Sequence, residues 1–183
     1  MVGLSPRNHG TLDAIPLGAI GRAPAIWQQR SNAAFIAALN SGQETFPGIS
    51  YTDIYTNTDE VVVPNLGGRA SSTLHGGGGQ ITNVAIQQVC PPDISEHLGI
   101  GTYDNPAYQL GSDALKHPGP AIPARLSGGS VCSHLLMPGV NPLTFVTDFA
   151  HMDAVVASTL ASYPHGTRAL TGPERVDPTD DQT

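Results

Sequence analysis

Two short stretches, each followed by a polar loop, dominate the pattern of hydrophobic and polar positions along this chain. The first predicted strand covers Ile49–Thr56, whose two alternating sets of residues suit a strand but are each of mixed polarity, so that the side facing the core is left open. The loop after it carries Asp59. The second predicted strand covers Ile81–Cys90 and is ended by two prolines, because proline cannot donate a hydrogen bond to a neighbouring strand. His97 lies in the polar stretch beyond this second strand.

Three other stretches show the spacing of helices. Asn32–Leu39 repeats apolar residues at helical intervals, and Ser31 is expected to cap its N-terminus. A short helix is predicted from Asp104 to Leu115. The longest candidate is Leu143–Tyr163, where an aromatic or aliphatic residue recurs every three or four positions.

The remaining segments predict how the chain is divided. Asn65–Gln80, with its run of four glycines, is expected to be a flexible connection. Residues 1–163 are expected to form one unit, and residues 164–183 are polar enough to predict a disordered tail. Strands joined by helical pieces favour the closing part of an α/β sheet over an all-β sandwich. In such sheets the functional residues lie beyond the carboxyl ends of the strands, which is where Asp59 and His97 are expected.

Composition narrows the range of partners. The 183 residues suffice for one domain with a core, and only 13% of them are charged, against about a quarter in an average protein. The net charge is −7, and the lack of a basic patch argues against a nucleic-acid partner and against an anionic membrane surface. No apolar run is long enough for a transmembrane helix. The first residues show no basic region followed by an apolar stretch, so an export signal would have to lie outside this sequence.

The two cysteines leave alternatives open. Cys90 and Cys132 are 42 positions apart (132 − 90 = 42), and both free thiols and a disulfide are compatible with that spacing. A disulfide would stabilise the fold by about 4 kcal/mol in the chain-entropy model and would indicate an oxidising compartment. A thiolate zinc site is not expected, because neither cysteine has a second cysteine at ligand spacing.

An Asp and a His at the ends of neighbouring strands form the pair that general-base catalysis requires. The carboxylate holds the imidazole in one tautomer and stabilises the imidazolium that forms when the ring takes a proton. By themselves Asp59 and His97 do not identify a catalytic site, because the chain contains seven His and 15 Asp plus Glu.

Several motifs in one order make the pattern more specific. GLSPRNHGT, APAIWQQRSNAAFIAALN, YTDIYTNTDEVVVP and NVAIQQVCPPDISEHLG together resemble the C-terminal half of the fungal lipase B-like family of α/β-hydrolases. Related actinobacterial secreted lipases share the pattern. The match runs from Gly3 to about Ala124, and continues more weakly to about Val156.

The resemblance implies roles for individual residues. Asp59 matches the acid of a Ser-Asp-His triad, and His97 matches its general base. Cys90 and Cys132 match a disulfide of the family, and the Leu143–Tyr163 helix resembles a mobile helix over the substrate pocket, with ordinary core packing as the alternative. Three residues beside the acid match positions that line that pocket: Glu60, Val61 and Val62. The family is secreted and needs neither a metal nor an organic cofactor.

The nucleophile is the missing part of this pattern. In α/β-hydrolases the serine precedes the acid in a G-x-S-x-G-like elbow, and no such elbow precedes Asp59. We therefore expect the C-terminal half of a lipase or carboxylesterase that cleaves acyl esters such as triacylglycerols, inactive alone and dependent on an N-terminal half of the same domain. The alternative is a non-catalytic lipase-like binding module or pseudoenzyme that retains an apolar pocket.

Overall fold

A three-stranded parallel sheet forms the centre of the described part of the chain, which in this computed structural model comprises residues 1–14, 24–126 and 130–162. Its strands are β1 (Val2–Leu4), β2 (Ser50–Tyr55) and β3 (Gln80–Ala85), in the order β1-β2-β3. Because all three run in parallel, their carboxyl ends lie at the same edge of the sheet.

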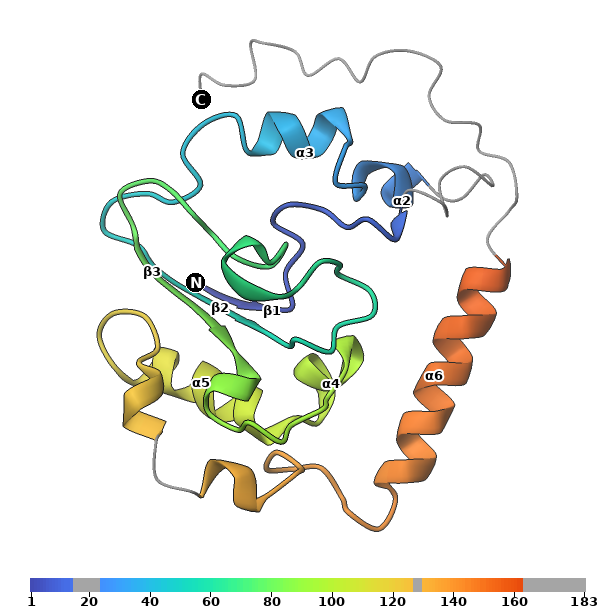
Figure 1. Ribbon diagram of the computed structural model, residues 1–183. Helices are drawn as coiled ribbons and strands as arrows, with labels where there is room; N and C mark the ends of the chain where they lie inside the picture. The colour runs from blue at the N-terminus through green and yellow to red at the C-terminus, as the bar shows by residue number, and fades with distance from the viewer. Residues whose placement is uncertain (15–23, 127–129, 163–183) are drawn as a thin grey trace.

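Helices flank this sheet on both faces (Figure 1). The helices α2 and α3 lie on one side, α4 and α5 lie on the other, and α6 stands along the flank of the molecule. Their bounds are α2 Pro24–Gln28, α3 Ala34–Leu39, α4 His97–Thr102, α5 Asn105–Lys116 and α6 Phe145–Ser162. Four short 3-10 turns complete the described elements: η1 Gly67–Arg69, η2 Ile86–Gln88, η3 Pro123–Leu126 and η4 Val131–Ser133.

The apolar core lies between the sheet and α5. Ile54 of β2 pairs in register with Val84 of β3, and both side chains are fully buried. Leu110 of α5 and Ile100 of α4 belong to the same cluster. The helix α5 begins where Asp104 caps it, since the Asp104 carboxylate accepts the Ala107 N–H at 2.6 Å.

The opposite face of the sheet is buried as well, and combines a small apolar cluster of Tyr55, Ala70 and Ala85 with polar side chains. Asp53 of β2 lies in register with Asn83 of β3, and its Oδ2 accepts a hydrogen bond from Asn8 Nδ2 at 2.7 Å. Asn83 binds both backbone polar groups of Leu74, at 2.9 and 2.8 Å. Burial raises the pKa of Asp53 to about 6, although the hydrogen bond from Asn8 works against that rise. This mixed polarity explains why the sequence pattern of β2 did not reveal which side faces the core.

The first predicted strand is confirmed as β2, whereas the second is predicted too long. The strand β3 ends at Ala85, and the chain then turns in η2. The N–H groups of Val89 and Cys90 both donate to the carbonyl of Ile86, which closes this turn and ends the pairing with β2. A run of β-favouring residues does not show where such a turn begins.

The predicted helices are confirmed, with one wrong cap. The helix α5 begins within one residue of its predicted start at Asp104, and α6 lies within the predicted range. Ser31 does not cap α3, which begins after Ala33 and has no side-chain cap. The Ser31 N–H instead donates to the Thr11 carbonyl at 3.1 Å, so Ser31 belongs to a contact with the N-terminal segment.

The prediction that Asn65–Gln80 is a flexible connection is wrong for most of its length. Its residues from Ala70 to Leu74 are buried and held by hydrogen bonds to other segments. The glycine run is held in place too, because Gly77 has a φ of +107° and a Cβ there would come within 2.1 Å of the Thr45 carbonyl oxygen. Glycine is needed here for close approach between segments.

Two other expectations have different outcomes. The predicted tail, residues 164–183, lies outside the described residues, and the predicted unit 1–163 stays a prediction. Among the helices that the structure describes, none is long and apolar enough to cross a membrane.

The buried carboxyl group of Asp53 generates a pH prediction. Because its pKa is raised from 3.8 to about 6, its contribution favours folding below pH 3.8 and is lost as the pH rises through 6. We expect the free energy of unfolding of Asp53→Asn, relative to that of the wild type, to rise by about 2–3 kcal/mol between pH 4 and pH 7. Urea unfolding at both pH values measures this. The matching change at exposed Asp148 should leave the pH dependence unaltered, and an equal effect at both positions would contradict the assignment.

Candidate active site

Asp59 follows β2 at the carboxyl edge of the sheet and is held by its own loop. Its Oδ1 accepts the N–H groups of Val61 and Val62, at 3.0 and 2.7 Å. This arrangement is a short turn closed by the side chain, which fixes the carboxylate relative to the backbone. Only 8% of Asp59 is exposed, so the remaining oxygen depends on partners from other segments.

His97 supplies one of those partners. Its Nδ1 lies 3.1 Å from Asp59 Oδ2, and the His97 side chain is 18% exposed. Because an ionised carboxylate only accepts hydrogen bonds, Nδ1 carries the hydrogen and Nε2 is left as the acceptor. Asp59 and His97 are therefore brought together as predicted, in the tautomer that a general base requires.

His97 is fixed by the start of a helix, and the sequence pattern had placed it in a loop. It is the first residue of α4, whose N-terminus is capped by Glu96. The Glu96 carboxylate accepts the N–H groups of Leu98 and Gly99, at 2.7 and 2.8 Å. Glu60 also accepts the His97 N–H at 3.2 Å, so the backbone of the histidine is tied to the residue beside Asp59.

The electrostatic setting keeps Asp59 ionised. Burial alone would raise its pKa, but the hydrogen bond and charge of His97 and the amides of Val62 and Val61 outweigh burial, so the pKa lies below its ordinary value. Arg7 adds a positive charge nearby. Burial lowers the pKa of Arg7, and the negative charge of Asp59 opposes that change.

The loop that carries Asp59, residues 56–63 (the acid loop), is also tied to the N-terminal segment by Thr11. Its hydroxyl donates to the Val61 carbonyl at 2.8 Å and accepts the Val63 N–H at 3.0 Å. The Leu12 N–H donates to the Val63 carbonyl at 2.9 Å. Thr11 is buried, so the loop is fastened from inside the molecule.

Asn65 is a second buried contact of the acid. Its Nδ2 donates to Asp59 Oδ2 at 3.3 Å, and its Oδ1 accepts the Ser72 N–H at 3.2 Å. The sequence pattern indicated neither Asn65 nor Thr11. Single polar residues in loops carry no periodic signal, and their partners come from segments that only the fold brings together.

The three residues predicted to line a pocket occupy different environments. Glu60 is exposed, Val61 is half-buried and Val62 is fully buried. The Val62 side chain thus packs inside the acid loop, while Glu60 and Val61 retain surface beside His97. Contact of these three residues with a substrate stays a prediction.

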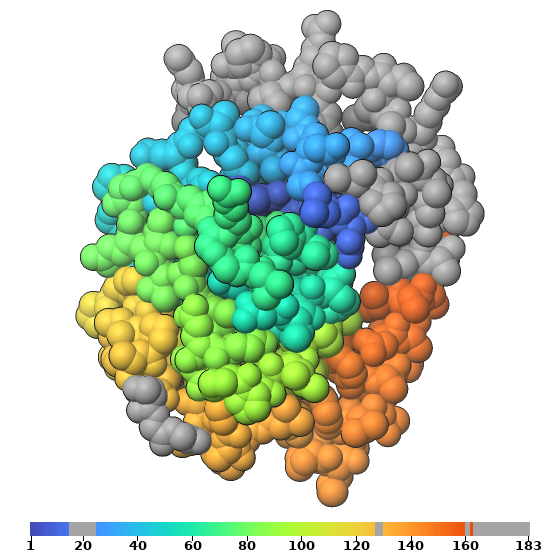
Figure 2. All heavy atoms as spheres, in the orientation of Figure 1, coloured from blue at the N-terminus to red at the C-terminus, as the bar shows by residue number. Residues whose placement is uncertain are grey.

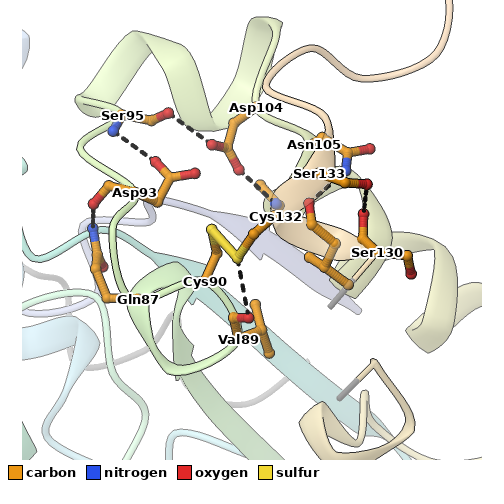
Figure 3. The surroundings of a disulfide bond; sticks show 12 residues. Gln87, Val89, Cys90, Asp93, Ser95, Asp104, Asn105, Ser130, Cys132 and Ser133 are labelled. Carbon is orange, nitrogen blue, oxygen red and sulfur yellow. Dashed lines mark hydrogen bonds between the residues drawn. A yellow bond between two sulfur atoms is a disulfide. The ribbon is translucent and has the colours of Figure 1, made fainter. Parts of the chain in front are cut away.

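Cys90 and Cys132 form a disulfide, with Cα atoms 5.4 Å apart (Figure 3). The bond lies at the start of the loop that leads to His97. Further along this loop, Ser95 donates from its N–H to Asp93 Oδ1 at 2.8 Å and from its hydroxyl to Asp104 Oδ2 at 2.7 Å. The disulfide at Cys90 and the hydrogen bonds of Ser95 thus hold the segment that leads to α4 at its start and near its end.

The helix α6 meets the site region through an aromatic cluster. The Tyr103 ring contacts Phe145 and Phe149, with ring centroids 4.8 and 5.2 Å apart. Most other described side chains of α6 are exposed, among them Val146 at 74%, and Figure 2 shows the helix along one side of the molecule. Within the described residues α6 therefore packs on the rest of the chain mainly through this aromatic cluster, and its role over a pocket stays a prediction. A cavity of about 150 Å³ lies between α6 and Tyr103, and Met152 and Val140 contribute to its lining.

The described residues contain neither a serine bonded to His97 nor a cluster of metal ligands. No serine hydroxyl there is hydrogen-bonded to His97, and Ser5, the serine nearest the start of the chain, is buried in the turn after β1. Within residues 1–14, 24–126 and 130–162 no three His, Cys, Asp or Glu residues are arranged to hold a metal ion. What the site offers is an oriented imidazole without a bonded nucleophile.

Comparisons with known proteins find similarity to lipases. The chain is 32% identical to lipase B of Pseudozyma antarctica over 120 residues, which cover 63% of this chain and 34% of that protein. It is similar to the crystal structure of Aspergillus fumigatus lipase B with a TM-score of 0.78 and 28% identity, covering 93% of this chain and 43% of that one. No family model matches the chain.

These similarities confirm the predicted resemblance to lipase B and the predicted fold class, a portion of an α/β-hydrolase fold. The chain spans less than half the length of each of these two lipases. The catalytic roles of Asp59 and His97 are therefore argued below as a proposal.

The hydrogen bond between Asp59 and His97 predicts the effect of removing the charge. In Asp59→Asn the ring loses its anionic acceptor, so the share of the Nδ1–H tautomer should fall. The ¹⁵N chemical shifts of the two ring nitrogens of His97 report that share. The same change at exposed Asp13 should leave both shifts in place, and unaltered shifts in Asp59→Asn would show that the contact does not set the tautomer.

The disulfide predicts a stability effect of its own. Removing it with the pair Cys90→Ser and Cys132→Ser should lower the free energy of unfolding by about 4 kcal/mol, because the closed loop of 42 positions is lost from the unfolded chain. Urea unfolding measures the change. Dithiothreitol should bring the wild type to the same value and leave the double variant unaffected. A loss well under about 1 kcal/mol would show that strain or residual structure cancels the gain.

Proposed function

We propose that this chain is the C-terminal half of a serine hydrolase, a lipase or carboxylesterase that cleaves acyl esters such as triacylglycerols. The observation that carries the proposal is the hydrogen bond of Asp59 to His97, 3.1 Å long, at the carboxyl edge of a parallel sheet. The order of acid before base along the chain is that of α/β-hydrolases. The similarity to two lipases B supports the same reaction class.

In the proposed reaction His97 moves the protons and Asp59 orients it. Nε2 of His97 takes the proton of a serine hydroxyl as that serine attacks the ester carbonyl, and then gives it to the leaving alcohol. In the second half, Nε2 takes a proton from a water molecule as that water attacks the acyl-enzyme carbonyl, and returns this proton to the serine oxygen as the acid leaves. Asp59 stabilises the imidazolium in both halves, and the proposed reaction requires no metal or organic cofactor.

The serine and the oxyanion donors must come from the N-terminal half of such a domain, which is the proposed partner. The edge of β1 that faces away from β2 is the place where this half would continue the sheet. Leu4 of β1 is 47% exposed there and Leu115 of α5 is 80% exposed. Together with Val2, Ile100 and Tyr108 they line an apolar groove of about 320 Å³. Parallel sheets are covered on both faces in folded proteins, so this groove suits a strand and helix of the preceding half.

The substrate would approach beside the acid loop. Glu60 and Val61 retain surface next to His97, Val62 packs behind them, and α6 presents aromatic and aliphatic side chains on the same flank. An apolar surface of this kind suits the acyl chain of a lipid or ester substrate. The disulfide suits an extracellular protein, and secretion is part of the proposal.

Complementation between halves tests this function. We expect neither this chain nor the N-terminal half of Aspergillus fumigatus lipase B to hydrolyse p-nitrophenyl esters alone, and the mixture to do so and to take up a fluorophosphonate on the N-terminal half. His97→Ala should lower the hydrolysis rate of the mixture by at least about 10³-fold, because the serine loses its base. His134→Ala, at an exposed histidine, is the matched control.

Two results would contradict the proposal. Labelling of a serine of this chain would assign the nucleophile differently. A stable complex of the two halves that neither hydrolyses ester nor takes up label would favour the non-catalytic binding module. Leu4→Asp should prevent complex formation, because it places a charge in the apolar groove, and this result separates docking from catalysis.

A further inference from the structure

The Asp59 carboxylate has two oxygens with different sets of partners. Oδ1 is held by the amides of Val61 and Val62 within the loop itself. Oδ2 is shared between His97 Nδ1 at 3.1 Å and Asn65 Nδ2 at 3.3 Å. The direction in which Oδ2 meets the imidazole therefore depends on one other side chain, Asn65.

The orientation of the Asn65 amide is fixed by its other end. Its Oδ1 accepts the Ser72 N–H at 3.2 Å, and only 2% of Asn65 is exposed. Rotating the amide by half a turn would set an oxygen against the carboxylate and an NH₂ group against the Ser72 N–H, which removes both hydrogen bonds. Asn65 therefore presents a donor to Asp59 without a competing arrangement.

The segment that holds Asn65 is itself fastened to the N-terminal segment. The Ser72 carbonyl accepts Asn8 Nδ2 at 2.9 Å, and the Ser71 N–H donates to the Pro64 carbonyl at 2.8 Å. The Ser71 carbonyl accepts the His9 N–H at 3.0 Å. Asn65 thus connects the acid to a rigid part of the fold and not to a free loop.

We propose that Asn65 is a positioning residue for the Asp59–His97 pair: held by Ser72, it fixes Asp59 Oδ2 in the direction that keeps the hydrogen of His97 on Nδ1. The proposal rests on the proposed function, since it gives Asn65 a role in the same reaction. Asn65 does not touch the reacting atoms. It acts through Asp59, whose freedom to rotate away from the imidazole it removes.

A neutral donor is the appropriate group at this position because charges already surround the pair. The charged and titratable groups that face Asp59 and His97, or their immediate neighbours, come from the N-terminal segment, the acid loop, the α4 cap and α6: Arg7, Glu60, Glu96 and Asp153. A carboxylate in place of Asn65 would repel Asp59 across a distance at which two carboxyl groups do not both ionise readily. The amide stabilises the anion of Asp59 without adding to this charge.

The first test removes the donor and reads the tautomer of His97 in the 183-residue chain. In Asn65→Ala the share of the Nδ1–H tautomer should fall, seen in the ¹⁵N shifts of the ring. Asn83→Ala is the matched control, because Asn83 holds the same segment through Leu74 and does not touch Asp59. Equal changes in the two variants would overturn the proposal, since they would show a general loosening of the segment.

The second test keeps the size of the side chain and changes its charge. Asn65→Asp should raise the apparent pKa of the Asp59 carboxyl group by about one unit or more, followed by its ¹³C shift. Asn57→Asp adds the same charge at an exposed position of the preceding turn, and should shift that pKa by less than about 0.3 units because solvent and salt screen it. An unaltered pKa of the Asp59 carboxyl group in Asn65→Asp would contradict the contact between Asn65 and Asp59.

A kinetic readout separates this inference from the proposed function. In the complemented enzyme, Asn65→Ala should lower kcat about 10- to 100-fold with KM unaltered, because the base is misdirected while substrate contacts remain. Wild-type kinetics in this variant would sink the positioning role and leave the proposed function standing. A tautomer change with no activity in any complemented enzyme would sink the proposed function and leave the positioning contact standing.

Discussion

The contact between Asp59 and His97 is the constraint on which the other features of this structure converge. A buried carboxylate is costly unless its oxygens are hydrogen-bonded, and Asp59 meets this requirement with donors from three separate parts of the chain. Two come from its own loop, one from the first residue of α4 and one from Asn65. The loop, the start of α4 and the segment that holds Asn65 must all be in place before the carboxylate is satisfied, so the fold and the pair specify one another.

The sheet makes that convergence possible. β2 and β3 are parallel neighbours, so the chain leaves both at one edge and delivers Asp59 and His97 to the same place. The disulfide then shortens the free length between β3 and α4, and the Glu96 cap sets where the helix begins. Asp59 and His97 are thus oriented by contacts within this chain alone. The nucleophile in the proposed enzyme has only to approach an imidazole whose tautomer is already set.

The sequence was sufficient for the framework and for the two residues of the pair, and insufficient for what holds them. The residue pattern predicts strands that end before Asp59 and before His97. Proposing these two residues as acid and base required the resemblance to lipase B. Asn65 and Thr11 could not be found in this way, because each acts through partners many positions away. The glycine run shows a different limit: composition predicts that glycine permits unusual backbone shapes, and only the close approach of Thr45 shows that one such shape is fixed.

β2 and the loop after it carry two buried carboxyl groups whose pKa values shift in opposite directions. Asp53 is almost completely buried, with one side-chain donor from Asn8, and burial raises its pKa to about 6. Asp59 is nearly as buried, yet the His97 imidazole and the backbone amides of Val62 and Val61 hold its pKa below the ordinary value. An orienting acid must stay ionised while the neighbouring ring gains and loses a proton. Because burial is similar at the two positions, the number and kind of donors decide the difference, and it is the loop after the strand, with its turned backbone amides, that can supply them.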